Sequence, residues 1–259
     1  MKNIQDMLWV EWRKAVSSKI PLWTAICSIF MPLAIAFLIF AARNPEISQK
    51  LGLISVKANL VAYSSTNWSS YLGLTGMIIA AGGFFLFVLA VSWIFGREFA
   101  DGTVKDMLAV PVQRSSILLA KLIVAAIWFI LLTIVILIVS LIMGAVINLP
   151  GGSFDTILQG IFLVLITDCL VIAVSLPFAL VASAGRGYIL PLGLAVLTLI
   201  LTNVVAIAGW GDYFPWAIPG IFAQGKNTLT PVSYLIAVLT GLAGMAGTYF
   251  WWKYADQNR

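Results

Sequence analysis

The chain has 259 residues, of which 61% are hydrophobic and only 10% are charged, and its mean hydropathy is +1.03. These values lie outside the range of soluble globular domains and indicate an integral membrane protein. At about 20 apolar residues per crossing, the chain has room for about six helical spans and no soluble domain. The formal net charge of +5 comes from basic residues scattered over several loops, which is not the dense patch that nucleic-acid binding requires.

Residues 1–19 are predicted to form an amphipathic helix that lies in the membrane surface, ahead of the first span. At about 100° per residue, an apolar side faces a mostly charged one: Ile4, Met7, Leu8, Trp12 and Ala15 against Lys2, Asp6, Arg13 and Ser17. A secretory signal is not indicated, because the segment carries charges of both signs and the apolar run behind it is long enough to span. Glu11 falls inside the apolar arc. It is either an i,i+3 partner of Lys14 or, together with Arg13 and Lys14, a contact for a cytoplasmic partner.

Six spans appear as long stretches between charged residues. The first three runs are uncharged over 23, 39 and 33 positions, at residues 20–42, 58–96 and 122–154, and each is long enough to cross a hydrocarbon core of about 30 Å. Allowing for the later runs, the spans are expected at about residues 20–42, 71–96, 118–147, 156–184, 188–209 and 231–252. Their lengths fit helices and not transmembrane strands, so residues 1–259 are expected to form one all-α integral membrane domain.

The distribution of Lys and Arg predicts the orientation, because basic residues are retained on the cytoplasmic side. If both termini are cytoplasmic, eleven of the fifteen basic residues lie inside, and the exceptions are Arg43, Lys50, Lys57 and Lys226. Residues 43–70 and 209–230 are then extracytoplasmic. Residues 97–116 form a cytoplasmic connector between spans two and three.

This connector contains the pattern of a short helix. Thr103 followed by Asp106 resembles a capping box, and Pro111 would end the helix. One face of it is apolar, formed by Val104, Met107 and Leu108. A helix of about two turns is not stable alone in water, so we expect it to dock into a groove of a soluble protein. The alternative is a polar loop that serves topology only.

The stretch GREFADGTVKDMLAVPVQRSSILLAKL resembles the signature of the permeases of type-two ATP-binding-cassette exporters, in which a Glu, a Gly-Thr pair, a Leu, a Pro, an Arg and a Lys recur in this order. The matching positions are Glu98, Gly102, Thr103, Leu108, Pro111, Arg114 and Lys121. The amphipathic amino terminus, the number of spans and the chain length also agree with that family. Within it, the chain is most similar to the short bacitracin and lantibiotic self-protection permeases.

The resemblance implies that the connector is a coupling helix in a cleft of a separate ATPase subunit, and that two permease chains, identical or diverged, pair with two ATPases. Closure of the ATPases around ATP and Mg²⁺ would convert an inward-open cavity to an outward-open one in a bacterial cell membrane. The permease itself would bind no cofactor and carry no catalytic residue, and its cargo would be an antimicrobial peptide, a drug or another amphipathic molecule. Carried onto this chain, the ATPase contact comprises Glu98, Asp101, Gly102, Thr103, Val104, Lys105, Met107, Leu108, Pro111 and Arg114.

Residues 209–230 combine Gly, Pro and aromatic residues, which argues against a straight span. An interfacial or re-entrant segment at the outer leaflet is predicted, because Trp and Tyr favour that depth. It is either an exit element of the transport pathway or an aromatic anchor, and the residues concerned are Trp210, Tyr213, Phe214 and Trp216. The stretch GIFAQGKN at residues 220–227 lacks the Ser or Thr that a P-loop needs for Mg²⁺, so no nucleotide site is expected there.

Asp168 is the one acidic residue deep in an expected span. An intramembrane carboxylate marks either a pathway for a cationic substrate or a structural hydrogen bond between helices. The candidate partners for the second alternative are Thr167, Thr202 and Asn203.

Two groups of residues predict helix irregularities and close helix packing. Kinks or loosened turns are expected at Pro32, Pro177, Pro191 and the Gly82–Gly83 pair. Close helix contacts are expected at Gly73, Gly76, Gly241, Gly244 and Gly247.

Three classes of function can be compared. The sequence has no His and only two Cys, which argues against a zinc or haem site, and the spans carry no catalytic constellation of an enzyme. A secondary transporter or channel that acts without an ATPase is the main alternative, but neither an inverted repeat nor several membrane-embedded ionisable residues are found. An exporter subunit is the class that explains the charged connector and the amphipathic amino terminus.

Overall fold

The computed structural model describes residues 2–44, 46, 66–104, 112–225 and 229–254. Every regular element within these ranges is helical. In the described part of the chain, six helical segments are long and apolar enough to cross a membrane: Ile20–Arg43, Trp68–Ala100, Arg114–Val146, Phe154–Ala184, Ile189–Ile207 and Pro231–Tyr254. The prediction of an all-α fold with six spans is confirmed, and each observed segment overlaps one of the expected ranges.

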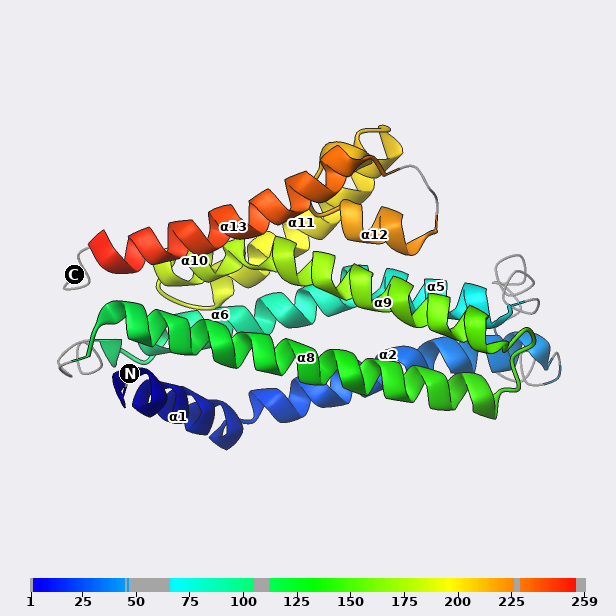
Figure 1. Cartoon of the computed structure of the whole chain (residues 1–259), viewed down its shortest axis with the longest axis horizontal. Helices are drawn as coiled ribbons and strands as arrows, with labels where there is room; N and C mark the ends of the chain where they lie inside the picture. Colours follow the sequence, from blue (N-terminus) through cyan, green and yellow to red (C-terminus); the bar gives the residue numbers. More distant parts are fainter. Residues whose placement is uncertain (1, 45, 47–65, 105–111, 226–228, 255–259) are drawn as a thin grey trace.

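The amino terminus forms two consecutive helices, α1 (Lys2–Ser17) and α2 (Ile20–Arg43). Pro21 lies in the first turn of α2, where its missing N–H has no intrahelical partner to lose. Both helices pack against α8 (Arg114–Val146), the third span. In Figure 1 α1 lies along one end of α8, and α2 follows the remainder of its length.

The second span consists of α5 (Trp68–Ile78), the π-helical turn η2 (Ile79–Gly83) and α6 (Phe84–Ala100). The side chain of Asn67 accepts a hydrogen bond from the backbone N–H of Ser70 and caps the start of α5. The π turn contains the Gly82–Gly83 pair, where a loosened helix was expected. A Cβ atom at Gly82 would lie 2.6 Å from the methyl carbon of Met31, so the glycine lets α2 approach this turn closely.

The fourth span is divided at a proline into α9 (Phe154–Ser175) and α10 (Pro177–Ala184). Pro177 has no N–H to donate to the preceding turn, and the Leu176 N–H bonds to the carbonyl oxygen of Ala173 instead, at 3.3 Å. The interruption predicted at Pro177 is therefore present.

The sixth span, α13 (Pro231–Tyr254), packs on this interruption through a row of glycines. A Cβ atom at Gly241 would lie 2.9 Å from the carbonyl oxygen of Ala173, and one at Gly244 would lie 2.5 Å from the backbone nitrogen of Pro177. Such distances leave no room for a side chain, so the glycines permit contact between helix backbones. The predicted close packing is confirmed at these positions.

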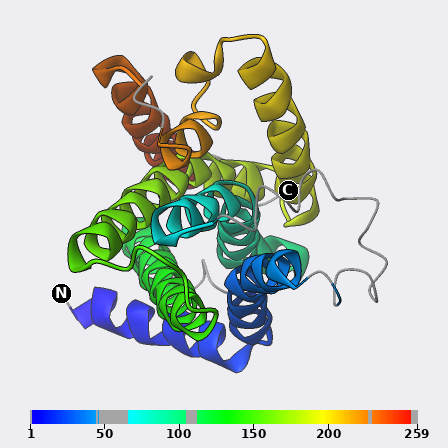
Figure 2. The same ribbon diagram turned by 90° about the vertical axis from the view of Figure 1, so that its right-hand side faces the viewer.

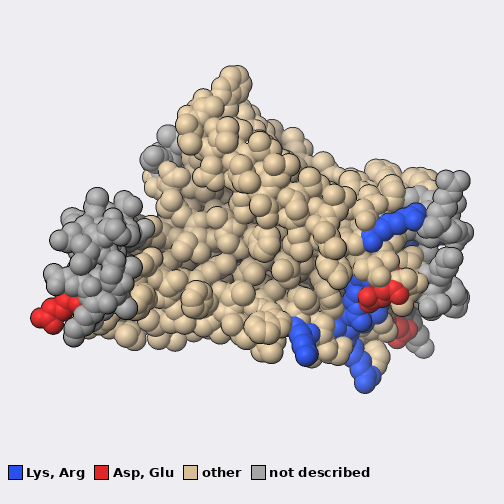
Figure 3. All heavy atoms as spheres, turned by 180° about the vertical axis from the view of Figure 1, so that it is seen from behind, with Lys and Arg blue, Asp and Glu red and all other residues tan. Residues whose placement is uncertain are grey.

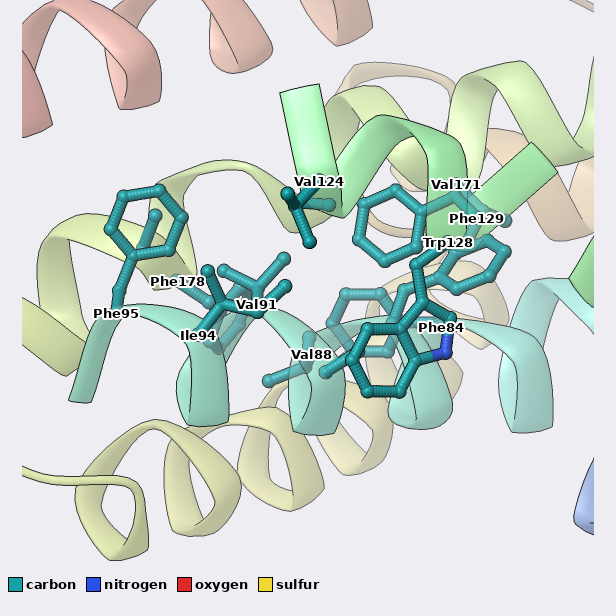
Figure 4. Close-up of a cluster of buried hydrophobic side chains, with 14 of the residues drawn as sticks. Phe84, Val88, Val91, Ile94, Phe95, Val124, Trp128, Phe129, Val171 and Phe178 are labelled. Carbon is teal, nitrogen blue, oxygen red and sulfur yellow. The ribbon is translucent and has the colours of Figure 1, made fainter. Parts of the chain in front are cut away.

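The most buried helix of the bundle is α6, which contacts α8, α9, α10 and α11 (Ile189–Ile207). Figure 4 shows the apolar side chains that α6 contributes to the core, Phe84, Val88, Val91, Ile94 and Phe95, beside Trp128 and Phe129 of α8 and Phe178 of α10. In the end view of Figure 2, α1 and α2 lie on one side of the bundle and α11 and α13 on the opposite side. Most of α11 is exposed, with Pro191 and Ala195 as its buried residues, which suits a helix that faces lipid.

The described basic residues are distributed unevenly along the bundle. The chain enters α1 and leaves α13 at the same end of the bundle (Figure 1). On the face shown in Figure 3, Lys and Arg side chains gather at this end, and the remainder of the described surface is nearly free of charge. This polarity is the one that the positive-inside rule requires if this end is cytoplasmic.

Candidate functional site

Four charged side chains form an ion cluster at the basic end of the bundle. Lys121 of α8 donates from Nζ to Glu98 Oε1 of α6 at 2.8 Å and to Glu11 Oε2 of α1 at 3.2 Å. Lys14 of α1 donates to Glu11 Oε1 at 2.7 Å and to Glu98 Oε1 at 3.1 Å. The cluster therefore joins three helices, and its two cations balance its two anions.

Helix periodicity brings Glu11 into the cluster. Met7, Glu11 and Ala15 are four residues apart, lie on one face of α1 and are all buried against the bundle. This explains why Glu11 falls in an otherwise apolar arc of the sequence. Of the two alternatives for Glu11, the structure shows the i,i+3 pair with Lys14 and adds a second lysine from α8.

The four side chains of the cluster differ in how deeply they are buried. The side chain of Lys121 is fully buried, and its third hydrogen bond goes to the carbonyl oxygen of Ile94 at 2.7 Å. Glu11 and Glu98 are each only 4% exposed. Burial opposes the charged form of Lys14, but the carboxylates of Glu11 and Glu98 outweigh it and raise the pKa of Lys14 above its ordinary value of 10.5.

The cluster joins the two arms of the connector between spans two and three. Glu98 lies in the last turn of α6, and Lys121 lies two turns inside α8. A buried charge is tolerated only when it is paired and hydrogen-bonded, so separating these two helix ends would expose or isolate both groups. The pair consequently fixes the distance between the points where the connector leaves and re-enters the bundle.

The carbonyl and amide groups at the end of α6 form a tight helix cap that accounts for the Gly-Thr pair of the sequence signature. Gly102 has a positive φ of 71°, its N–H bonds to the Phe99 carbonyl oxygen, and the Thr103 N–H bonds to the Glu98 carbonyl oxygen at 2.9 Å. These two bonds are those of the Schellman motif, in which a glycine adopts the left-handed conformation. Gly102 and Thr103 thus end α6 two residues after the cluster.

The other residues predicted for the ATPase contact differ in their exposure to solvent. Asp101 is exposed and pairs with Arg97 at 3.4 Å, and Val104 is buried. Glu98 does not offer its carboxylate at the surface, because its Oε1 atom is held by two lysines of this chain. Arg114 is exposed, and its Nη1 donates to the Trp252 carbonyl oxygen at 3.3 Å. Lys105, Met107, Leu108 and Pro111 lie outside the described residues.

Lys121 is the member of the cluster that the sequence analysis did not assign to a site. It appears there only as the last position of the sequence signature. A signal was present, because Lys121 is the single charge between Arg114 and the end of a long apolar run. A lysine at that position must either reach the membrane surface or find a buried partner, and the partners lie on helices far away in sequence.

Asp168 is buried in α9 and faces α8. One oxygen of its carboxylate lies within hydrogen-bond distance of the Thr133 hydroxyl, whose single proton is shared between this oxygen and the Phe129 carbonyl oxygen. The partners expected from the sequence were wrong: the hydroxyls of Thr167 and Thr202 and the amide of Asn203 all donate to carbonyl oxygens of their own helices. The error arose because only the packing of α9 on α8 reveals the partner. Of the two alternatives, this geometry supports the structural hydrogen bond between helices.

The aromatic segment before the last span forms the 3-10 turn η3 (Gly211–Tyr213) and the short helix α12 (Ile218–Ala223). Trp210 and Tyr213 are 68% and 60% exposed, as an aromatic anchor in the membrane interface would be. Trp216 instead turns inward, where its indole N–H donates to the Val174 carbonyl oxygen at 2.9 Å and its ring meets Phe214 and Phe178. The segment is thus attached to the bundle where α9 approaches its interruption.

No group of three or more metal-ligating side chains occurs within the described ranges. The four charged members of the ion cluster also leave no carboxylate pair free to hold a cation between them, because each Glu contacts a lysine. In the described part of the chain, the chemistry of the cluster is therefore electrostatic attachment of helices.

The fold and the cluster define a multi-pass helical membrane protein whose second and third spans are fixed together at one end. Comparison with known proteins identifies the family of this membrane protein. The chain belongs to the family described as ABC-2 family transporter protein, whose sequence pattern matches residues 7–202. It is also similar to the bacitracin transport permease protein BCRB of Bacillus licheniformis, at 25% identity over 176 residues that cover 66% of this chain and 84% of that protein.

These relationships confirm the resemblance to type-two permeases. The chain is a membrane subunit of an ABC transporter and not its catalytic subunit, and membership of the family implies association with an ABC ATPase. The match begins at Met7 in α1 and includes all four members of the ion cluster.

Proposed function

We propose that this chain is the permease of an ATP-driven exporter and that its connector, around residues 101–111, contacts a separate ATPase subunit. The observation that carries the proposal is the buried cluster that ties Glu98 of α6 to Lys121 of α8. A force applied to a connector with fixed ends moves both helices together, whereas a connector with loose ends would absorb it. Fixed ends of this kind suit a connector on which something outside the bundle acts.

The amino-terminal helix α1 is attached to the ends of the connector through the same ion cluster. Glu11 and Lys14 attach α1 to the ends of α6 and α8, so α1 moves with the connector and not independently of it. Arg13 lies on the exposed side of α1, with its guanidinium 5.1 Å from the Trp9 ring centre. In this proposal Arg13 faces the cytoplasm or the ATPase, while Glu11 and Lys14 act from inside the bundle.

The transport cycle follows from coupling at this end. Closure of two ATPases on ATP and Mg²⁺ would draw together the connectors of two permease chains and convert a cavity open to the cytoplasm into one open to the outside. ATP and Mg²⁺ would be bound by the ATPases. The gathering of basic residues at the α1 end supports cytoplasmic termini in a bacterial cell membrane.

The cargo class is proposed from the relative and from the surface chemistry. The similar Bacillus protein is described as a bacitracin transport permease. In this chain the exposed faces of the described spans carry many large apolar side chains, so an amphipathic cargo such as an antimicrobial peptide or a drug fits better than an ion. One Asp168 oxygen is bonded to Thr133, so in this proposal the carboxylate links helices and is not a cargo contact.

The test is co-purification of tagged protein from its native membrane in mild detergent, comparing the wild type with Met107→Asp. Met107 belongs to the predicted apolar face of the connector, and a carboxylate there would be desolvated in a docked helix. We expect a soluble ATPase to co-elute with the wild type and to be lost from Met107→Asp.

The matched control is Met107→Leu, which keeps the apolar volume and is expected to retain the ATPase. If the wild type elutes without an ATPase, a transporter or channel that works alone becomes the better description. If Met107→Asp retains the ATPase and stimulates it normally, the coupling contact lies elsewhere in the chain.

A further inference from the structure

A pocket of about 290 Å³ lies where the first turn of α8 meets the last turn of α13. It is separate from the ion cluster: none of the four cluster residues lines it. Two cationic side chains, Arg114 and Lys253, line it from the two helices, and none of the described residues in its lining is acidic. Within the described part of the chain, the pocket therefore carries positive charge without an acidic partner.

The positions of the two cations leave donors for a ligand. Arg114 uses Nη1 for the Trp252 carbonyl oxygen, and a guanidinium has five N–H donors in a planar fork that matches phosphate geometry. The ammonium of Lys253 lies 5.8 Å from the Tyr249 ring centre and 5.1 Å from that of Tyr254. These contacts with the two tyrosines hold the side chain beside the pocket, and an ammonium with three N–H donors keeps at least one of them for an anion.

The backbone at the start of α8 adds to the positive potential in the pocket. Helix α8 has 33 residues and begins at Arg114, and its N-cap residue Gln113 makes no side-chain capping bond. The first N–H groups of a helix carry a partial positive charge that favours an anion. Ser115, in the first turn, brings an exposed hydroxyl to the lining.

Apart from Gln113 and Ser115, the rest of the lining is largely apolar. Leu118 and Trp252 are buried beneath it, and Tyr249, 38% exposed, forms its edge toward the outer surface of α13. Both helices are candidate spans, and the pocket lies at their ends, where a membrane changes from hydrocarbon to headgroups. A ligand that fits both parts of this lining has a phosphate at one end and hydrocarbon at the other.

We propose that this pocket binds the phosphate headgroup of an anionic phospholipid from the leaflet that contacts the α1 end of the bundle. The phosphate lies between Arg114 and Lys253, accepts from the start of α8, and its acyl chains lie along the exposed apolar face of α13. The lipid joins α8 to α13 on the side of α8 away from α1. The site does not depend on which cargo is transported or on the presence of an ATPase.

The experiment measures bound lipid on the full chain. Delipidated protein is equilibrated in neutral detergent micelles that contain equal amounts of dioleoyl phosphatidylglycerol and dioleoyl phosphatidylcholine, and retained lipid is identified by native mass spectrometry. We expect the wild type to retain phosphatidylglycerol in preference to phosphatidylcholine. The double variant Arg114→Gln/Lys253→Gln should reduce this preference by about tenfold or more, since it removes two charge-assisted contacts to phosphate.

The matched control is Arg97→Gln/Lys19→Gln. It removes the same charge from residues near the same end of the bundle that do not line the pocket, so it should leave the preference unchanged. A further variant, Ser115→Asp, keeps the test valid if the double variant unfolds. A carboxylate in the first turn of α8 favours the helix but repels phosphate, so Ser115→Asp should remain folded and lose the lipid.

Three results would overturn the proposal. The first is a wild type with no preference for phosphatidylglycerol, or a preference that the double variant and Ser115→Asp keep. The second is loss of retained lipid when inorganic phosphate is added at millimolar concentration, which assigns the pocket to the free anion. The third is a wild type that retains no lipid, together with a Ser115→Asp variant that loses a co-purifying ATPase. This result would assign the pocket to a carboxylate of the partner protein.

Discussion

Lys121 Nζ lies 2.8 Å from Glu98 Oε1, although 23 positions separate the two residues and neither side chain reaches the surface. The pair joins the end of α6 to the body of α8. Both ends of the connector between them are therefore fixed by the bundle itself. In the function proposed above, such a contact would make the connector a rigid attachment for a partner subunit.

Removing the central lysine should strongly destabilise the fold. Lys121→Met would leave Glu98 without its closest cation and Glu11 with Lys14 alone. Breaking a buried ion pair by removing one partner costs about 3–5 kcal/mol, because the remaining charge is desolvated without compensation. The thermal unfolding midpoint of the purified protein in detergent measures the effect.

Arg97→Gln is the control for Lys121→Met. Its pair with Asp101 is half exposed, with side-chain exposures of 35% and 55%. Exposed ion pairs contribute about 0–1 kcal/mol, so this variant should unfold close to the wild type. Equal unfolding midpoints for Lys121→Met and Arg97→Gln would show that the cluster contributes nothing to stability.

The attachment of α1 should weaken at alkaline pH. The raised pKa of Lys14 means that the folded state holds this proton more tightly than the unfolded state. The contribution of Lys14 is fully present below its unfolded pKa of about 10.5 and is lost as pH rises through the higher folded value. Unfolding midpoints measured between about pH 8 and about pH 11 should fall more steeply for the wild type than for Lys14→Arg.

Lys14→Arg isolates this effect because arginine stays protonated throughout that range. Other groups that titrate are common to both proteins and cancel in the comparison. Parallel curves for the two proteins would mean that the charge of Lys14 does not hold α1 in place.

Position 102, in the cap of α6, should accept asparagine but not valine. Gly102 has φ of 71°, a conformation in which β-branched residues are strained and asparagine is accepted. No atom lies within 4 Å of a Cβ built there, so strain and not collision decides the result. We expect Gly102→Val to lower ATPase co-purification and to destabilise the protein by about 1–3 kcal/mol, and Gly102→Asn to resemble the wild type. Identical behaviour of the two variants would refute the role of this cap in placing the connector.

The contact between α13 and the interruption at Pro177 should not accept even a methyl group. In Gly244→Ala the new Cβ would lie 2.5 Å from the Pro177 nitrogen, and backbone atoms must separate to accommodate it. We expect destabilisation by about 1–3 kcal/mol, as for overpacked cores. Gly193→Ala is the matched control, since nothing lies within 4 Å of its Cβ and alanine favours a helix. A lower thermal unfolding midpoint for Gly193→Ala than for Gly244→Ala would contradict the observed packing.

Asp168→Asn should leave transport intact. The asparagine carbonyl oxygen can accept from the Thr133 hydroxyl as the carboxylate does, so the link between α8 and α9 is kept. Asp168→Leu removes the acceptor and should lower the unfolding midpoint, by an amount that corresponds to about 1 kcal/mol for a lost hydrogen bond. Drug or peptide efflux by cells that carry each variant gives the transport readout. If Asp168→Asn is stable but does not transport, its negative charge belongs to the pathway.

The sequence by itself determined the class, the number of spans and the family. Hydropathy and charge spacing are local properties, and a run such as residues 122–154 must cross the membrane whatever surrounds it. The glycines and Pro177 also predicted interrupted and closely packed helices, because their backbone effects act at their own positions.

Only the tertiary structure decided which charges meet. Glu11 and Lys121 are 110 positions apart, and Asp168 and Thr133 are 35 apart on different helices. A residue's helical face follows from periodicity, but the helix that covers this face follows from how the whole bundle packs. For the same reason the sequence indicated Lys14 as a partner of Glu11, while the α8 lysine that completes the cluster required the fold.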